Sequence, residues 1–166
     1  MRRNLPLAAG AAAALITLTT GTAQAADAPL TMLIGDASLS LYASAAPADG
    51  TANDPYVRML RLAGAPEQHW QFAANGESTT IVNVGTGGCL GIDPAGLLPY
   101  ATLSHCTGDR TQLWDLKWDD IGTVFVNAGT GECLTQPPTF TPPGAGDRLT
   151  VTRCDGGESQ SFSIVW

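Results

Sequence analysis

Hydrophobic and polar residues alternate along most of the chain once the N-terminal segment is passed. Alternation with a period of two is typical of strands with one buried face. It is clearest over residues 57–62, 101–106, 112–118, 148–154 and 160–166. Proline and glycine crowd the connections, and no stretch shows the period and caps of a long helix. The pattern predicts an all-β protein built from many short strands.

One nine-residue segment occurs twice. Residues 82–90 read VNVGTGGCL, and residues 126–134 read VNAGTGECL. Each copy follows a β-branched, apolar run and contains a glycine-rich turn, as expected for a hairpin. A second cysteine follows at 106 or 154. A Gln-x-aromatic motif comes next, and its aromatic residue, at 114 or 162, lies eight positions after the second cysteine in both copies. The repeat predicts two copies of one supersecondary unit.

A third copy, without cysteines, precedes these two. Its motif is QHW at 68–70, and Leu62 stands where the other copies have their second cysteine. Laying residues 33–41 on the repeated segment places Ser40 at the first cysteine. Three units of about four strands each suggest a closed threefold body. An open solenoid normally has more copies and distinct capping ends.

Three Gln-x-Trp-like motifs at near-equal spacing, two of them with a Cys-Leu pair and a second cysteine, resemble the ricin-type β-trefoil lectin domain. The resemblance covers roughly residues 28–166. It implies a β-trefoil of three lobes, at about 28–75, 76–118 and 119–166. The first lobe departs from the family in lacking both cysteines, and the third has Phe162 in place of tryptophan.

The resemblance also implies structural roles. In the family, the cysteine after the turn bridges to the next strand of its lobe. This implies the pairs Cys89–Cys106 and Cys133–Cys154, out of the three connectivities that four cysteines allow. Each bridge would close a loop of about 20 residues and contribute roughly 3 kcal/mol in the loop-entropy account. The motif residues are expected to bond backbone within their lobes or to fill the shared core: Gln68, Gln112, Gln160, Trp70, Trp114 and Phe162.

Residues 1–25 have the character of a secretory signal peptide. Arg2 and Arg3 precede an apolar run that ends in Ala23-Gln24-Ala25, with small residues at the positions a signal peptidase requires. The run is too short and too rich in glycine and threonine for a membrane span, which needs about 20 apolar residues. All four cysteines would then enter an oxidising compartment. We expect a secreted, extracellular protein with one domain and no membrane span.

The charge balance limits the partners. The chain has 15 acidic and 8 basic residues, a net charge of −7. Such a chain is a poor candidate for binding nucleic acid or anionic lipid surfaces. Asp115, Asp119 and Asp120 gather around Trp118. We interpret this group as a solvated turn, with a weak calcium site as the alternative.

Catalytic chemistry has little basis in the sequence. The two histidines are His69, inside a core motif, and His105, next to a cysteine expected to be bridged. No nucleophile with an adjacent base stands out, and the cysteines appear as pairs. We therefore expect a protein that is not an enzyme and that holds no cofactor and no metal.

The family's usual sugar site needs three residue types. An aspartate two residues after the first cysteine accepts hydroxyl hydrogen bonds, an aromatic residue two before the second cysteine stacks on the sugar, and an asparagine precedes the motif glutamine. No lobe keeps any of them at its position. The residues found there are Tyr42, Leu60 and Glu67 in the first lobe, Gly91, Ser104 and Thr111 in the second, and Thr135, Thr152 and Ser159 in the third.

A displaced site stays open. Asp93 lies two residues beyond the expected acid position, with Tyr100 nearby, although an aspartate before proline is also a common turn former. An insertion in the third lobe, residues 137–146, places Phe140 between prolines. These prolines would present the ring at low entropic cost, unless it folds back on the body. Tyr42 is a further candidate contact.

Two functions follow from these observations. The leading one is a secreted, non-catalytic carbohydrate-binding module whose site for a glycan or polysaccharide is non-standard or degenerate. The alternative is a degenerate trefoil that serves as a protein-binding adaptor or targeting subunit of a co-secreted complex or toxin. The resemblance supports the first and the missing site residues support the second, and a fold alone does not decide between them.

Overall fold

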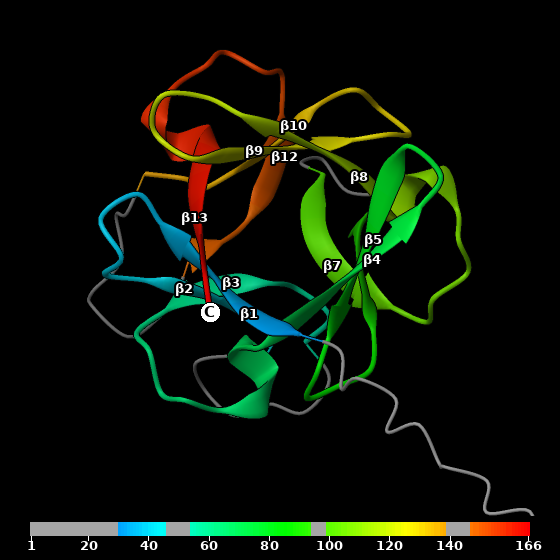
Figure 1. The fold of residues 1–166 in the computed structure, drawn as a ribbon, viewed down its shortest axis with the longest axis horizontal. Coiled ribbons are helices and arrows are strands. Elements are labelled where there is room, and N and C mark those ends of the chain that lie inside the picture. Colours follow the sequence, from blue (N-terminus) through cyan, green and yellow to red (C-terminus); the bar gives the residue numbers. More distant parts are fainter. Residues whose placement is uncertain (1–29, 46–53, 94–98, 139–146) are drawn as a thin grey trace, which may run out of the picture.

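The computed structural model describes residues 30–45, 54–93, 99–138 and 147–166 (Figure 1). The predicted all-β character is confirmed, since the regular structure of these ranges is short strands and three single 3-10 turns. The strands are β1 (Thr31–Asp36), β2 (Tyr42–Ser44), β3 (Arg58–Leu60), β4 (Trp70–Asn75), β5 (Ser78–Asn83), β6 (Cys89–Asp93), β7 (Tyr100–Ser104), β8 (Leu113–Trp118), β9 (Thr123–Asn127), β10 (Cys133–Thr135), β11 (Asp147–Arg148), β12 (Thr150–Thr152) and β13 (Ser161–Val165). The 3-10 turns are η1 (Pro66–Gln68), η2 (Arg110–Gln112) and η3 (Glu158–Gln160).

Six of the strands close into a barrel. The antiparallel pairings run in the order β1, β4, β5, β8, β9, β13 and return to β1. The other strands form the hairpins β2–β3, β6–β7 and β10–β12, which meet where β12 pairs with β7 and β11 pairs with β3. Figure 1 shows three such units around a common centre. This architecture is the predicted β-trefoil.

The strand register defines which residues are equivalent in the three lobes. Each motif aromatic is the cross-strand partner of one polar residue on the neighbouring barrel strand: Trp70 of Asn83, Trp114 of Asn127 and Phe162 of Asp36. In the next pairing along the chain, the first cysteine of lobes 2 and 3 lies opposite a valine. Tyr42, opposite Gly35, holds the corresponding position in lobe 1.

This register corrects the alignment of lobe 1, which placed Ser40 at the first cysteine and is wrong by two residues. The three turns have the same length, because Asp36, Asn83 and Asn127 each donate a backbone N–H to the carbonyl five positions later. The lobe 1 turn nevertheless lacks the glycines on which the sequence comparison rested. Its positive φ falls instead on Leu39, at 56°.

Asparagine organises the repeated turn of lobes 2 and 3. The Oδ1 atom of Asn83 accepts the N–H of Thr86 at 3.1 Å, and Asn127 does the same for Thr130 at 3.2 Å. Their Nδ2 atoms donate to backbone carbonyls just before the preceding glutamine motif, at 2.7 Å and 2.9 Å. Gly87 and Gly131 complete the turns at φ of 70° and 74°, which glycine adopts without a steric penalty. The turn therefore also locks one unit to the next.

The motif glutamines make the same bonds in every lobe. Gln112 donates from Nε2 to the carbonyl of His105 at 2.8 Å and accepts the N–H of Thr107 at Oε1, also at 2.8 Å. Gln68 and Gln160 repeat this pair of bonds within their own lobes at 2.7–3.0 Å. All three side chains are buried. One amide thus satisfies the backbone of a bend that no strand pairs.

Three aromatic residues form the centre of the core. Trp70, Trp114 and Phe162 are at most 1% exposed. The two indole N–H groups donate to the carbonyls of Ala43 and Leu90, at 3.1 Å and 2.9 Å. Phe162 needs no such partner, which explains why the replacement in lobe 3 is tolerated.

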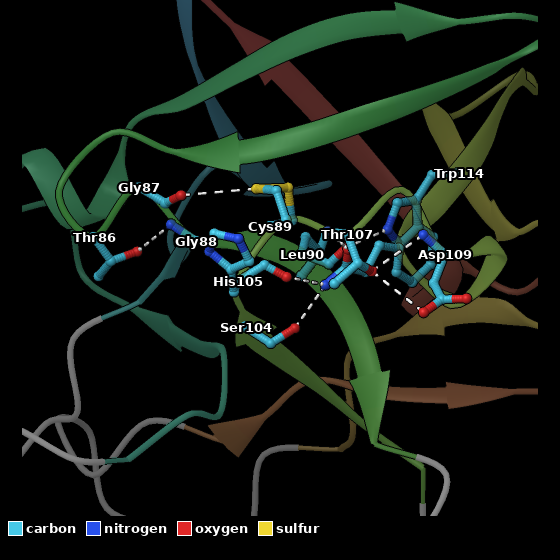
Figure 2. The surroundings of a disulfide bond; sticks show 12 residues. Thr86, Gly87, Gly88, Cys89, Leu90, Ser104, His105, Thr107, Asp109 and Trp114 are labelled. Atoms are coloured by element: carbon cyan, nitrogen blue, oxygen red, sulfur yellow. Dashed lines mark hydrogen bonds between the residues drawn. A yellow bond between two sulfur atoms is a disulfide. The ribbon is translucent and has the colours of Figure 1, made fainter.

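Both implied disulfides are present, Cys89–Cys106 in lobe 2 and Cys133–Cys154 in lobe 3. In each bridge the Cα atoms are 5.0 Å apart, and no cysteine in the described chain is free. Figure 2 shows the lobe 2 bridge beside the repeated turn, with its second sulfur directed at the carbonyl of Gly87. Each bridge links the first residue of a hairpin, Cys89 of β6 or Cys133 of β10, to the segment just after the second strand of that hairpin.

Replacing Gln112 by alanine should destabilise the fold by roughly 2–4 kcal/mol. The change removes the hydrogen bonds to the carbonyl of His105 and the N–H of Thr107, each of which contributes about 0.5–1.5 kcal/mol, and it also deletes part of a buried side chain. Urea unfolding of the oxidised protein measures the effect, with Gln71→Ala on the half-buried face of β4 as the matched control. Equal stability of the two variants would show that the motif glutamine does not hold the lobe.

Candidate functional site

The ligand positions of lobe 3 are occupied by hydrogen bonds inside the lobe. Thr135 and Thr152 stand where the family places its acid and its ring, on the paired strands β10 and β12. Their hydroxyls bond one another at 2.8 Å, and Nε2 of Gln160 donates to both at 3.1 Å. These groups are satisfied by the motif glutamine rather than directed at a ligand.

Lobe 2 is closed in a similar way. The hydroxyl of Ser104 accepts Nε2 of Gln112 at 2.7 Å, next to the disulfide in Figure 2. Gly91, at the acid position, is buried. A Cβ atom added to it would lie 3.0 Å from Cγ of Gln112 and 3.3 Å from the carbonyl of Thr111. A carboxylate at this position would therefore have to displace the glutamine that holds the lobe.

Lobe 1 offers no substitute at these positions. The corrected register places Ser44, which is 2% exposed, at the acid position. Tyr42 is buried at the cysteine position, where its ring packs next to Gly35. A ligand would find no aromatic face of Tyr42 at the surface.

Asp93 and Tyr100 are brought together, since they are cross-strand partners on β6 and β7. Tyr100 meets Tyr56 edge to face, with the ring centroids 5.1 Å apart. The guanidinium carbon of Arg148 lies 4.0 Å from the centroid of Tyr56 and 5.6 Å from that of Tyr100. Tyr56, Tyr100 and Arg148 come from lobes 1, 2 and 3, so their contacts contribute to packing between the lobes whatever else they bind.

Asp54 anchors this cluster. Its carboxylate accepts a hydrogen bond from Nη2 of Arg58 and lies 3.6 Å from Nη2 of Arg148, and the side chain is only 11% exposed. Burial alone would raise the pKa of Asp54. The hydrogen bonds from Arg58 and from the N–H of Tyr56, with the charges of both arginines, outweigh burial and hold the pKa below its usual value. Asp54 is therefore ionised at neutral pH and ties lobe 1 to lobe 3.

A polar pocket of about 440 Å³ lies between lobes 1 and 3. Asp36 and Ser38 of the β1–β2 turn form one wall. Strand β10 and turn η3 form the other, which consists of Thr135, Gln136, Pro137, Pro138, Glu158 and Ser159. Two carboxylates, an amide and several hydroxyls thus surround one concave surface next to the ligand positions of lobe 3.

The groups of this pocket differ in how far they are already bonded. Both carboxylate oxygens of Asp36 accept bonds from its own turn, namely from the hydroxyls of Ser38 and Ser40 and the N–H groups of Ser40 and Leu41. Glu158 and Ser159 are exposed on η3. Glu158 is therefore the principal acceptor for an incoming hydroxyl, and Asp36 adds fixed negative charge.

Sequence patterns did not indicate this pocket. Its two walls are 97 residues apart in the chain at their nearest, from Ser38 to Thr135, and meet only when the barrel closes. Phe140, the remaining candidate, lies outside the described residues, two positions after Pro138. Asp36 was the one residue whose position could have pointed to this pocket. The shifted alignment of lobe 1 did not place it at the turn position held by Asn83 and Asn127.

Other chemistries find no support in the described ranges. They hold no group of three or more His, Cys, Asp or Glu side chains placed to bind a metal ion. His69 bonds the carbonyl of Ala65 through Nδ1 at 3.0 Å. No described helix has the length and apolar character of a membrane span.

The ion pairs of Asp54 should make stability depend on pH. A carboxylate with a lowered pKa in the folded state contributes stability that is present above its unfolded pKa and is lost as pH falls through the folded one. We expect Asp54→Asn to lower the free energy of unfolding by roughly 1–3 kcal/mol at pH 7, since hydrogen bonds to charged groups have about that value.

Urea unfolding at pH 7 and pH 2.5 tests this. The difference between wild type and Asp54→Asn should shrink at the lower pH, because the contribution of the carboxylate is lost as pH falls through its folded-state pKa. Asp120→Asn, an exposed change, is the control. A difference that is the same at both pH values would contradict an electrostatic role for Asp54.

Comparison with known proteins agrees with this geometry. Residues 66–145 match the model of the family described as ricin-type beta-trefoil lectin domain-like. No curated protein sequence gives a significant match.

Several solved structures share the fold. ThreeFoil, a designed threefold-symmetric protein, aligns with a TM-score of 0.71 at 18% identity, over 82% of this chain and 98% of its own. The Macrolepiota procera ricin B-like lectin, solved with lactose, aligns at 0.68 and 14% identity, over 84% and 97%. The Rhizoctonia solani agglutinin aligns at 0.67 and 14%, over 83% and 95%. The described chain thus has the β-trefoil fold, and its residues 66–145 match the ricin-type beta-trefoil lectin domain-like family, as the Gln-x-aromatic motifs implied.

Proposed function

We propose that the protein is a secreted, non-catalytic module that binds carbohydrate in the polar pocket between lobes 1 and 3. The observation that carries the proposal is the pocket itself, in which Glu158, Ser159 and Gln136 surround a space of about 440 Å³. The fold, shared with lectins such as the lactose-bound one, makes saccharide the first ligand to consider.

The chemistry of the pocket suits a polyhydroxylated ligand. A carboxylate accepts two hydroxyl hydrogen bonds, and hydroxyl and amide groups both donate and accept them. The negative charge of Asp36 and Glu158, on a chain of net charge −7, disfavours sulfated or carboxylated sugars. We infer a neutral or amino sugar as the ligand class.

A sugar site also benefits from an aromatic face, and Phe140 is the nearest candidate. It follows Pro138, a residue of the pocket wall, by two positions. We propose that Phe140 supplies this stacking surface.

Secretion and lack of catalysis belong to the same proposal. The two disulfides are compatible with an oxidising compartment. The signal peptide proposed for residues 1–25 lies outside the described residues.

A glycan array on the oxidised protein, followed by titration of the strongest neutral hit, tests the proposal. Glu158→Gln should weaken binding about tenfold or more, because a hydroxyl bond to a carboxylate is worth roughly 1.5–3 kcal/mol. Glu77→Gln, an exposed change in the β4–β5 turn, should leave the affinity unchanged.

The alternative site gives the opposite pattern. If the sugar binds at Asp93 and Tyr100, then Asp93→Asn and Tyr100→Ala weaken binding while Glu158→Gln and Phe140→Ala do not. An array without any competable hit, on protein shown to be folded and free of thiols, would refute carbohydrate binding at either site.

A further inference from the structure

A second concave surface lies at the end of the barrel where β8 turns into β9. It is a groove of about 500 Å³ lined by Phe72, Leu116, Phe162 and Ile164, with Trp118 and Trp166 at its edges. The first four side chains belong to the core or pack against it. The groove therefore opens directly onto the hydrophobic interior.

The tryptophans at its edges are unusually exposed. Trp118 is 76% exposed and Trp166 is 78% exposed, whereas the other two tryptophans are fully buried. Ile121, on the same β8–β9 turn, is 51% exposed. Single exposed apolar residues are ordinary, but a contiguous group of large ones marks an interaction surface.

The turn that carries Trp118 and Ile121 is held rigidly. Oδ1 of Asp119 accepts the N–H groups of Ile121 and Gly122, at 2.8 Å and 2.7 Å, and the hydroxyl of Ser161 on β13 at 3.0 Å. A Cβ atom on Gly122 would lie 2.5 Å from the carbonyl oxygen of Phe162, so only glycine fits. A preorganised surface loses little entropy when a partner binds.

The rim of the groove is mostly acidic. Asp119 and Asp120 follow Trp118 directly, and Lys117 precedes it. The backbone N–H groups of Gly122 and Ile121 lower the pKa of Asp119, which keeps it ionised at neutral pH. Together with the net charge of −7, this rim attracts cationic partners.

Three other occupants fit less well. A saccharide would find the hydroxyls of Thr123 and Ser163 and the indole N–H donors of Trp118 and Trp166, but no carboxylate or amide, among the side chains that line the groove, and most of its own hydroxyls would lose hydrogen bonds to water. A second copy would bring Asp119 and Asp120 against their own counterparts. An anionic membrane would be repelled by the same charge.

We propose that this groove docks a segment of another polypeptide that carries both apolar and basic side chains. The apolar side chains would enter between Trp118 and Trp166, and lysine or arginine would meet Asp119 and Asp120. This inference does not depend on carbohydrate binding, because the polar pocket and the groove share no lining residue.

Acrylamide quenching of tryptophan fluorescence reads the groove directly, since only Trp118 and Trp166 are exposed. The probe is a synthetic peptide of leucine, phenylalanine and lysine, compared with the same peptide in which glutamate replaces lysine. We expect the cationic peptide to reduce the quenching constant about twofold. Binding should weaken at high salt, because the rim charges are exposed and screened.

Trp118→Ser should weaken peptide binding about tenfold, as loss of an aromatic anchor does. Leu62→Ser, which removes another exposed apolar residue, in lobe 1, is the control and should not change it. Neither substitution should alter binding in the glycan array, so the two proposals can fail separately.

Four results would overturn the proposal. The first is equal protection from quenching by the acidic peptide, and the second is protection by saccharides instead of peptide. The third is protection that rises with protein concentration alone and accompanies a dimer in sedimentation, and the fourth is no protection by any of these. The second result would assign the groove to sugar, and the third would make it a contact between copies of this chain.

Discussion

Each lobe of this protein depends on one buried glutamine. The side chains of Gln68, Gln112 and Gln160 bond the carbonyl and the N–H of a bend that no strand pairs. Without that amide, the bend would lose the two hydrogen bonds that fix it against the core. The aromatic residue two positions later points inward from the strand that the bend introduces. The motif recurs in the sequence because each lobe needs the same two side-chain hydrogen bonds to the backbone of its bend.

The same glutamines also bond the residues that stand at the family's ligand positions in lobes 2 and 3. In lobes 2 and 3 their Nε2 atoms have a further acceptor, the hydroxyl of Ser104 or those of Thr135 and Thr152. Small hydroxyl residues occupy these positions, and their bonds connect the hairpin to the motif glutamine. The binding surfaces we propose lie elsewhere, in the polar pocket between lobes 1 and 3 and at the open end of the barrel.

Much of the fold could be predicted from the sequence. Period-two alternation, the repeated turn and the motif spacing indicated the trefoil and both disulfides, because these features are local or recur at fixed intervals. The alignment of lobe 1 failed because its turn has Asp36 and Ser40 where the others have asparagine and glycine, and its positive φ falls one position earlier, on Leu39. Strand register was needed to correct it. The polar pocket and the tryptophan groove were not predicted, since each joins segments from opposite ends of the chain.

The central claim is that ligand contacts have moved from the motif positions to the pocket between lobes. Chemical-shift mapping by NMR with the best neutral glycan tests it most directly. The account predicts shifts at Ser38, Gln136 and Ser159, with the side-chain amide of Gln112 unperturbed. Shifts centred on Gln112 and Ser104, with none at Gln136, would contradict it and return the site to the motif position of lobe 2.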